Sequence, residues 1–111
     1  MKVKVTNQAN LSKLISYLES LPDKRFNLGV ELTNETEDNP ALMCGCIEGH
    51  IRIIIERTDE DYDTGIAGEY IEDYLGVTPA EAEYIYLYKW SVQGVNGTRK
   101  DAIKYLKSLQ S

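Results

Sequence analysis

The 111-residue chain has the length of one domain, so we expect a single globular domain over residues 1–111. Hydrophobic residues make up 42% of the chain and charged residues 27%, which allows a modest core and argues against disorder. Neither a signal peptide nor a transmembrane segment is recognisable, because the longest purely aliphatic run is Ile53 to Ile55. Cys44 and Cys46 are too close in sequence to bridge easily, which predicts free thiols in a reducing, cytoplasmic compartment.

The net charge of −6 is distributed unevenly along the chain. Residues 31–83 contain fifteen acidic and two basic residues, a local charge of −13, whereas residues 1–30 carry +3 and residues 84–111 carry +4. An acidic middle repels nucleic-acid phosphates and anionic membranes, and it favours a cation or a basic protein. We therefore expect neither direct nucleic-acid binding nor membrane binding. The alternative is that these charges only keep the fold soluble.

The first half of the chain predicts one clear helix and one weaker strand. Apolar residues at helical spacing predict a helix over residues 11–21, and Asn7 or Asn10 can cap its start. Residues 26–32 alternate apolar and polar side chains like a strand, and residues 2–6 are a candidate extended partner for it.

The isoleucine-rich segment around residues 46–56 is ambiguous. Its isoleucines fit one face of a helix and one face of a strand equally well, and β-branching favours the strand. Periodicity alone does not decide between the two structures.

Three further helices are predicted in the second half. An apolar stripe over residues 66–75 predicts a helix that Gly76 ends. The capping box Thr78–Glu81 begins another, although the alternation in residues 84–88 predicts an extended end. Thr98, with an aspartate three residues later, caps the last helix. With the ambiguous segment counted as a helix, the sequence predicts a mainly α fold of about five helices, and a short two-stranded extended pair would make it α+β.

One short segment gathers both cysteines and the only histidine. Cys44, Cys46 and His50 could supply three zinc ligands, or a thiol nucleophile with its base, in a small metal- or thiol-dependent enzyme. A structural zinc site needs a fourth ligand, and no second Cys or His pair exists to supply it. The alternative, which we favour, is that the cysteines pack as small buried residues in a structural hinge, so we expect no cofactor.

Residues 59–66 resemble a calcium-binding loop in part. Three alternating aspartates precede a glycine, as in such loops. The glycine stands at the seventh position instead of the sixth, and Tyr70 occupies the twelfth position, where a bidentate glutamate is required. A weak calcium-binding module is a further alternative.

The eight tyrosines favour a protein partner, because tyrosine buries a large area while keeping a polar group. Together with the acidic middle, they predict a non-enzymatic protein-binding module with a basic partner. The predicted interaction surface consists of Asp59, Glu60, Asp61, Asp63, Glu69, Glu72, Asp73, Tyr84 and Tyr88.

Short motifs over residues 11–109 resemble a family of small uncharacterised bacteriophage and bacterial proteins. The motifs are Phe26-Asn27-Leu28-Gly29, Cys44-Gly45, Cys46-Ile47-Glu48-Gly49, Tyr74-Leu75-Gly76-Val77-Thr78 and the helix capped by Thr98. This chain joins two cysteine motifs that the family separates by a few residues. The resemblance implies a phage-encoded protein in the cytoplasm of a bacterial host, and it favours a helix over residues 46–56. In one version of the binding hypothesis, the chain mimics nucleic-acid charge and inhibits a host-defence protein.

Overall fold

The computed structural model describes residues 2–26, 45–57, 68–88 and 98–111. Within these residues the chain is mainly helical and contains five α-helices, as predicted. The helices are α1 (Gln8–Ser20), α2 (Ile47–Ile54), α3 (Glu69–Leu75), α4 (Pro79–Glu83) and α6 (Arg99–Ser108). Two shorter segments are the 3-10 turn η1 (Asp23–Arg25) and the π-helical segment η3 (Tyr84–Tyr88).

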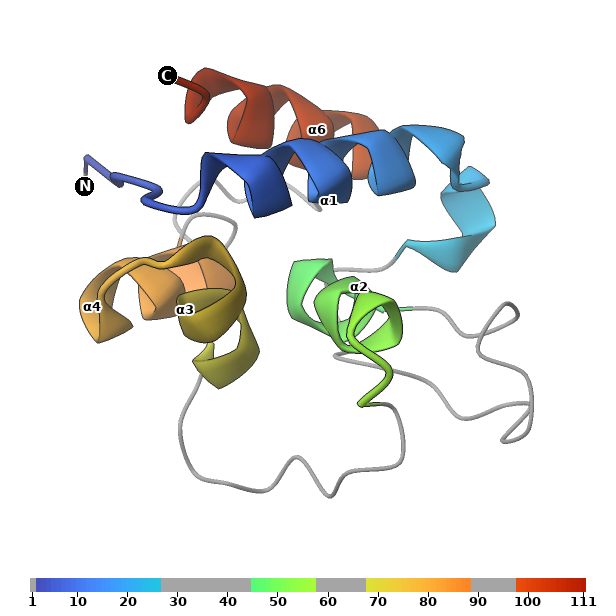
Figure 1. Cartoon of the computed structure of the whole chain (residues 1–111). Helices are drawn as coiled ribbons and strands as arrows, with labels where there is room; N and C mark the ends of the chain where they lie inside the picture. The colour runs from blue at the N-terminus through green and yellow to red at the C-terminus, as the bar shows by residue number, and fades with distance from the viewer. Residues whose placement is uncertain (1, 27–44, 58–67, 89–97) are drawn as a thin grey trace.

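The helices form two layers around one hydrophobic core. Helices α1 and α6 pack side by side in one layer, and α2, α3 and α4 lie in the other (Figure 1). Burial of apolar side chains between the layers provides most of the driving force for folding. The innermost side chains, all 0–1% exposed, are Leu11, Leu14, Leu18, Ile47, Ile51, Ile71, Leu75, Ala82, Ile85, Ala102 and Leu106.

The helix ends follow the predicted capping signals. The side chain of Asn7 accepts a hydrogen bond from the Asn10 amide at 3.0 Å, which caps α1. Both predicted capping boxes, at Thr78 and at Thr98, are present. Gly76 ends α3 in the left-handed conformation, with φ of 64°. Local sequence signals therefore define these boundaries.

The ambiguous isoleucine segment is helical. It forms α2, as the family resemblance favoured, and its isoleucines at positions 47 and 51 enter the core. The predicted extended end at residues 84–88 is wrong, because these residues continue α4 as η3. The capping box starts a helix there, and Ile85 stays in the core as the chain turns.

Only the first segment of the expected extended pair, residues 2–6, lies fully within the described residues. Residues 2–6 run to the end of α3, where the amides of Thr6 and Asn7 donate to the carbonyls of Gly76 and Leu75 at 3.3 and 3.0 Å. Residues 27–32 lie outside the described residues.

The turn after α2 stores local strain that a substitution should relieve. Glu56 has a φ of +60°, a left-handed conformation that costs a residue with a Cβ about 1 kcal/mol. Because its side chain is exposed, Glu56→Gly should raise the free energy of unfolding by about 1 kcal/mol in urea denaturation. Lys104→Gly, at an exposed position inside α6, should lower it by a similar amount. A loss of stability in both variants would contradict this account of Glu56.

Candidate functional site

Helix α2 is buried on nearly every side. Six consecutive residues from Ile47 to Arg52 are buried, and three of them, Glu48, His50 and Arg52, are polar or charged. Buried polar side chains are costly unless they are hydrogen-bonded, so each should have a partner.

His50 links α2 to α1 and η1 through both ring nitrogens. Its Nε2 lies 2.7 Å from the carbonyl oxygen of Arg25, and its Nδ1 lies 3.2 Å from the hydroxyl of Tyr17. A carbonyl only accepts, so Nε2 carries the proton and Nδ1 accepts from Tyr17. The imidazole also stacks on Phe26, with the ring centres 5.9 Å apart and the planes 7° apart. All of these contacts hold the fold together.

The chemistry of this segment is correspondingly limited. Burial lowers the pKa of His50 from 6.5 to about 4, so the imidazole is neutral at pH 7. Cys46 is buried and forms no disulfide, whereas Cys44 lies outside the described residues. No group of three His, Cys, Asp or Glu side chains in the described part of the chain is placed to hold a metal. Within the described residues, the contacts of His50 are those of a buried structural side chain, and Cys46 packs in the core.

Glu48 acts as a helix cap supplied from another helix. Its carboxylate accepts a hydrogen bond from the backbone amide of Tyr70, at the start of α3, at 2.8 Å. The N-cap residue of α3 is Gly68, which has no side chain to do this. A Cβ at Gly68 would lie 2.8 Å from the carbonyl carbon and oxygen of Ala82, so a capping side chain does not fit there.

Arg52 provides a second contact between α2 and α3. Its guanidinium is fully buried, and Nε donates to the carbonyl of Arg57 at 3.1 Å. The guanidinium carbon also lies 5.4 Å from the ring centre of Tyr70, a cation–π distance. Glu48 and Arg52 are four residues apart, and they therefore join the same face of α2 to α3.

The structure describes about half of the predicted interaction surface. Glu69, Glu72, Asp73 and Tyr84 are described, with each side chain partly or fully exposed. Tyr88 belongs to η3, but its side chain lies outside the described residues, as does the whole calcium-like loop 59–66. The remaining predicted residues outside the described part are Asp59, Glu60, Asp61 and Asp63.

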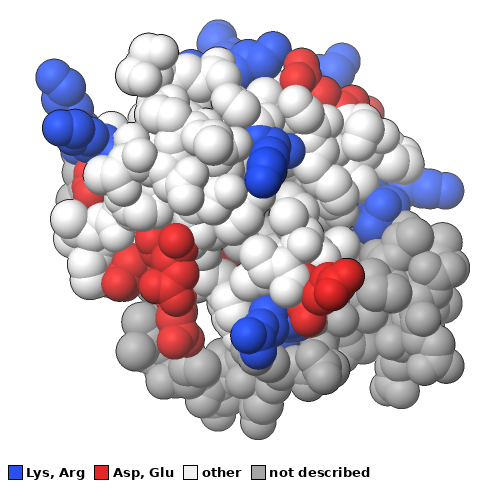
Figure 2. Space-filling view, in the orientation of Figure 1, with Lys and Arg blue, Asp and Glu red and all other residues white. Residues whose placement is uncertain are grey.

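Three carboxylates on α3 form what we call the acidic α3 face: Glu69, Glu72 and Asp73. Figure 2 shows acidic side chains gathered where Figure 1 places α3. None of the three forms an ion pair within the described residues. Other acids in the acidic middle have structural roles, because Glu48 caps α3 and Glu81 completes a capping box. Glu69 and Glu72 are partly exposed and Asp73 is exposed.

A pocket of about 470 Å³ opens beside the acidic α3 face. Helix α3 provides four of its residues, at positions 69, 70, 73 and 74, and the rest come from α1 and from the turn that follows α2. Asn10 of α1 donates to the carbonyl of Tyr74 at 2.8 Å, which joins the two walls. Sequence reasoning missed this pocket because its walls are distant in sequence, although the repeated acid–tyrosine pairs at 69–70 and 73–74 were visible.

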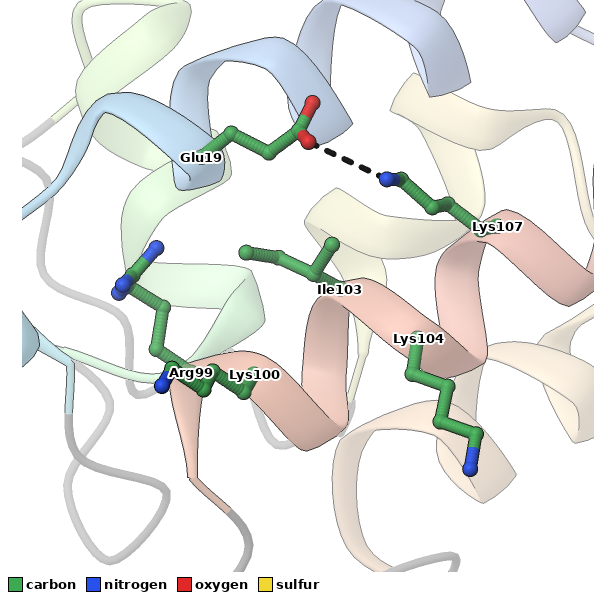
Figure 3. Close-up of a pocket in the computed structure, with 6 residues that line it drawn as sticks. All are labelled: Glu19, Arg99, Lys100, Ile103, Lys104 and Lys107. Carbon is green, nitrogen blue, oxygen red and sulfur yellow. Dashed lines mark ion pairs between the residues drawn. The ribbon is translucent and has the colours of Figure 1, made fainter.

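A second pocket of about 480 Å³, between α1 and α6, has the opposite charge (Figure 3). Two of its four cations already have acidic partners. Lys107 pairs with Glu19 at 3.2 Å, and Arg99 pairs with Asp23 at 2.9 Å and donates to a backbone carbonyl of α1. Both pairs include exposed side chains and stabilise the fold only weakly. They nevertheless show that part of the basic lining serves to join α6 to α1 and its following turn.

Comparison of the chain with family models, curated proteins and solved structures gave no match. No helix among the described residues is long and apolar enough to cross a membrane.

Proposed function

We propose that the chain is a non-enzymatic module that binds a basic protein through the acidic α3 face. The observation that carries the proposal is that Glu69, Glu72 and Asp73 lack ion-pair partners in the described residues, and that Glu69 and Asp73 line a pocket together with two tyrosines. Unpaired charges of one sign on one surface steer oppositely charged partners, and the partly exposed ring of Tyr70 adds contact area. Tyr84, which is partly exposed, belongs to the same predicted surface.

The source of the protein and the kind of partner are proposed from the sequence motifs and the charge distribution. The motif resemblance supports a phage-encoded protein in the bacterial cytoplasm, and the −13 charge of residues 31–83 supports a mimic of nucleic-acid charge. Such a mimic would occupy the basic surface of a host nucleic-acid-binding protein, for example one used in host defence.

A capture experiment with a matched charge control tests the proposal. The immobilised chain is exposed to bacterial lysate at about 50 mM salt and again at about 500 mM, where exposed charges are strongly screened. The double variant Glu72→Gln with Asp73→Asn should lose most of the captured basic protein. Glu19→Gln with Asp23→Asn removes the same charge from the α1–α6 side and should keep it.

Two results would contradict the proposal. One is the capture of no basic protein even at low salt. The other is an equal loss of capture in the two double variants, which would assign binding to net charge alone. Purified partner and chain can then be compared by calorimetry at both salt concentrations.

A further inference from the structure

The pocket beside the acidic α3 face combines three kinds of lining. Two carboxylates, Glu69 and Asp73, and one guanidinium, Arg57, line it, and these three groups carry a net charge of −1. The apolar part includes Ile55, a large hydrophobic residue that is 36% exposed. A volume of about 470 Å³ is within the usual range for ligand pockets. The lining therefore suits a group with a cationic end and an aliphatic stem.

Two polar atoms of the lining residues lack hydrogen-bond partners. Glu69 Oε2 and the hydroxyl of Tyr74 are buried and have no partner among the described residues, and Tyr74 as a whole is only 9% exposed. Buried polar atoms are rarely left unsatisfied in proteins, because losing water without gaining a partner costs free energy. A carboxylate only accepts hydrogen bonds, so the matching group is an N–H or O–H donor.

The same region already holds a cation on a tyrosine ring. The buried guanidinium of Arg52 lies over Tyr70, which also lines the pocket. Cation–π contacts strengthen when the cation is removed from water. The ring of Tyr70 therefore already contacts one cation in this region.

We infer that this pocket receives the side chain of a lysine or arginine from the bound protein. The inference rests on the proposed function and adds to it a specific site. The ammonium or guanidinium donates to the carboxylates of Glu69 and Asp73, and the methylene stem lies along Ile55. Arg57 at the same pocket repels a second cation and favours a single inserted side chain.

Small probes test the pocket without the partner. The chain is titrated with n-butylammonium, n-butylguanidinium and the neutral n-butanol, and backbone amide shifts are followed by NMR. We expect saturable shifts at residues 69–74 with one or both cations, with Kd in roughly the millimolar range for ligands this small. Butanol should bind at least about fivefold more weakly, because it lacks the charge that the carboxylates recognise.

Matched variants separate the pocket from the surrounding charge. Glu69→Gln should weaken cation binding at least about fivefold. Glu72→Gln removes the same charge from the same helix outside the pocket lining and should change binding less than about twofold. Arg57→Gln should have the opposite effect and strengthen cation binding about twofold, because it removes a repelling charge. Glu69→Gln should also change the midpoint temperature of unfolding by no more than about 3 °C. Substitution of a residue that holds the fold together would change that temperature more.

The outcomes distinguish this inference from the proposed function. Equal binding of butanol and butylammonium, no saturable shift at residues 69–74, or equal weakening by Glu69→Gln and Glu72→Gln would each overturn the pocket assignment. A basic protein captured through the acidic α3 face would still support the proposed function in that case. If no basic protein is captured but the probes bind as expected, the pocket is a cation-binding site and the proposal of a basic protein partner is wrong.

Discussion

Replacing Glu48 with alanine should lower the free energy of unfolding by about 3 kcal/mol. The Glu48 carboxylate is 2% exposed and caps the first turn of α3, where the helix dipole favours a negative charge. Alanine leaves the Tyr70 amide without this acceptor. It also removes the acidic residue one helical turn from Arg52, which is fully buried and always charged. Urea denaturation at pH 7 measures the loss.

Two further substitutions assign the loss to the buried carboxylate. Glu48→Gln keeps an acceptor oxygen but loses the charge, so it should cost less than Glu48→Ala, about 1–2 kcal/mol. Glu56→Gln, just beyond the same helix and exposed, should change stability by less than about 0.5 kcal/mol. Hydrogen exchange at the Tyr70 amide should accelerate in Glu48→Ala. Unchanged exchange there, or equal losses at positions 48 and 56, would refute the capping role.

Much of the fold was predictable because its signals are local. The caps at Asn7, Thr78 and Thr98 and the glycine at position 76 each act within one helical turn. The apolar stripe of α1 likewise follows from spacing alone, and its leucines reach the core. Local rules therefore predicted four of the five helices, α1, α3, α4 and α6, and most of their ends.

Helix α2 was harder to predict because tertiary contacts determine it. A surface helix has one polar face, but α2 is surrounded, so its polar residues are buried and satisfied by distant partners. Its isoleucines consequently show no single period that separates helix from strand. The glutamate at position 48 looked like an ordinary acid of the acidic middle, yet its partner is 22 residues away.

The candidate site was predictable in its charge and not in its shape. Composition identified an acidic middle with tyrosines, and the structure places three of those acids on the short helix α3. Composition does not show which acids are consumed by structure, as Glu48 and Glu81 are. The pocket depends on α1 and the turn that follows α2 meeting α3, and Asn10 and Ile55 carry no sequence signal for that contact.

Acidification from about pH 6.5 to pH 4 should remove about 3 kcal/mol of stability through His50 alone. The pKa of His50 is about 4 in the folded chain, below its ordinary value of 6.5, chiefly because burial disfavours the charged ring. Above pH 6.5 the ring is neutral in both states and contributes no pH dependence. Between 6.5 and 4 the unfolded chain binds a proton that the folded chain does not, so stability falls. Below pH 4 both states are protonated and the loss is complete.

Carboxylates also titrate in this range, so the His50 contribution is measured as a difference. Glu81, for example, has a pKa lowered mainly by its hydrogen bond from the Thr78 amide. Protonation of this carboxylate therefore also lowers the free energy of unfolding as the pH falls. Variant His50→Gln keeps a donor for the Arg25 carbonyl and an acceptor for the Tyr17 hydroxyl, but it does not titrate. The stability advantage of the wild-type chain over this variant should shrink by about 3 kcal/mol from pH 7 to pH 4.

A direct titration makes the result unambiguous, because His50 is the only histidine. Its imidazole proton signals should stay those of a neutral ring down to about pH 4 in the folded chain. In urea they should titrate near 6.5. A folded-state pKa near 6.5 would show that water reaches the ring, which conflicts with contacts to Tyr17, Arg25 and Phe26 on three sides. The same finding would reopen His50 as a candidate base, whereas a pKa near 4 would agree with its structural role.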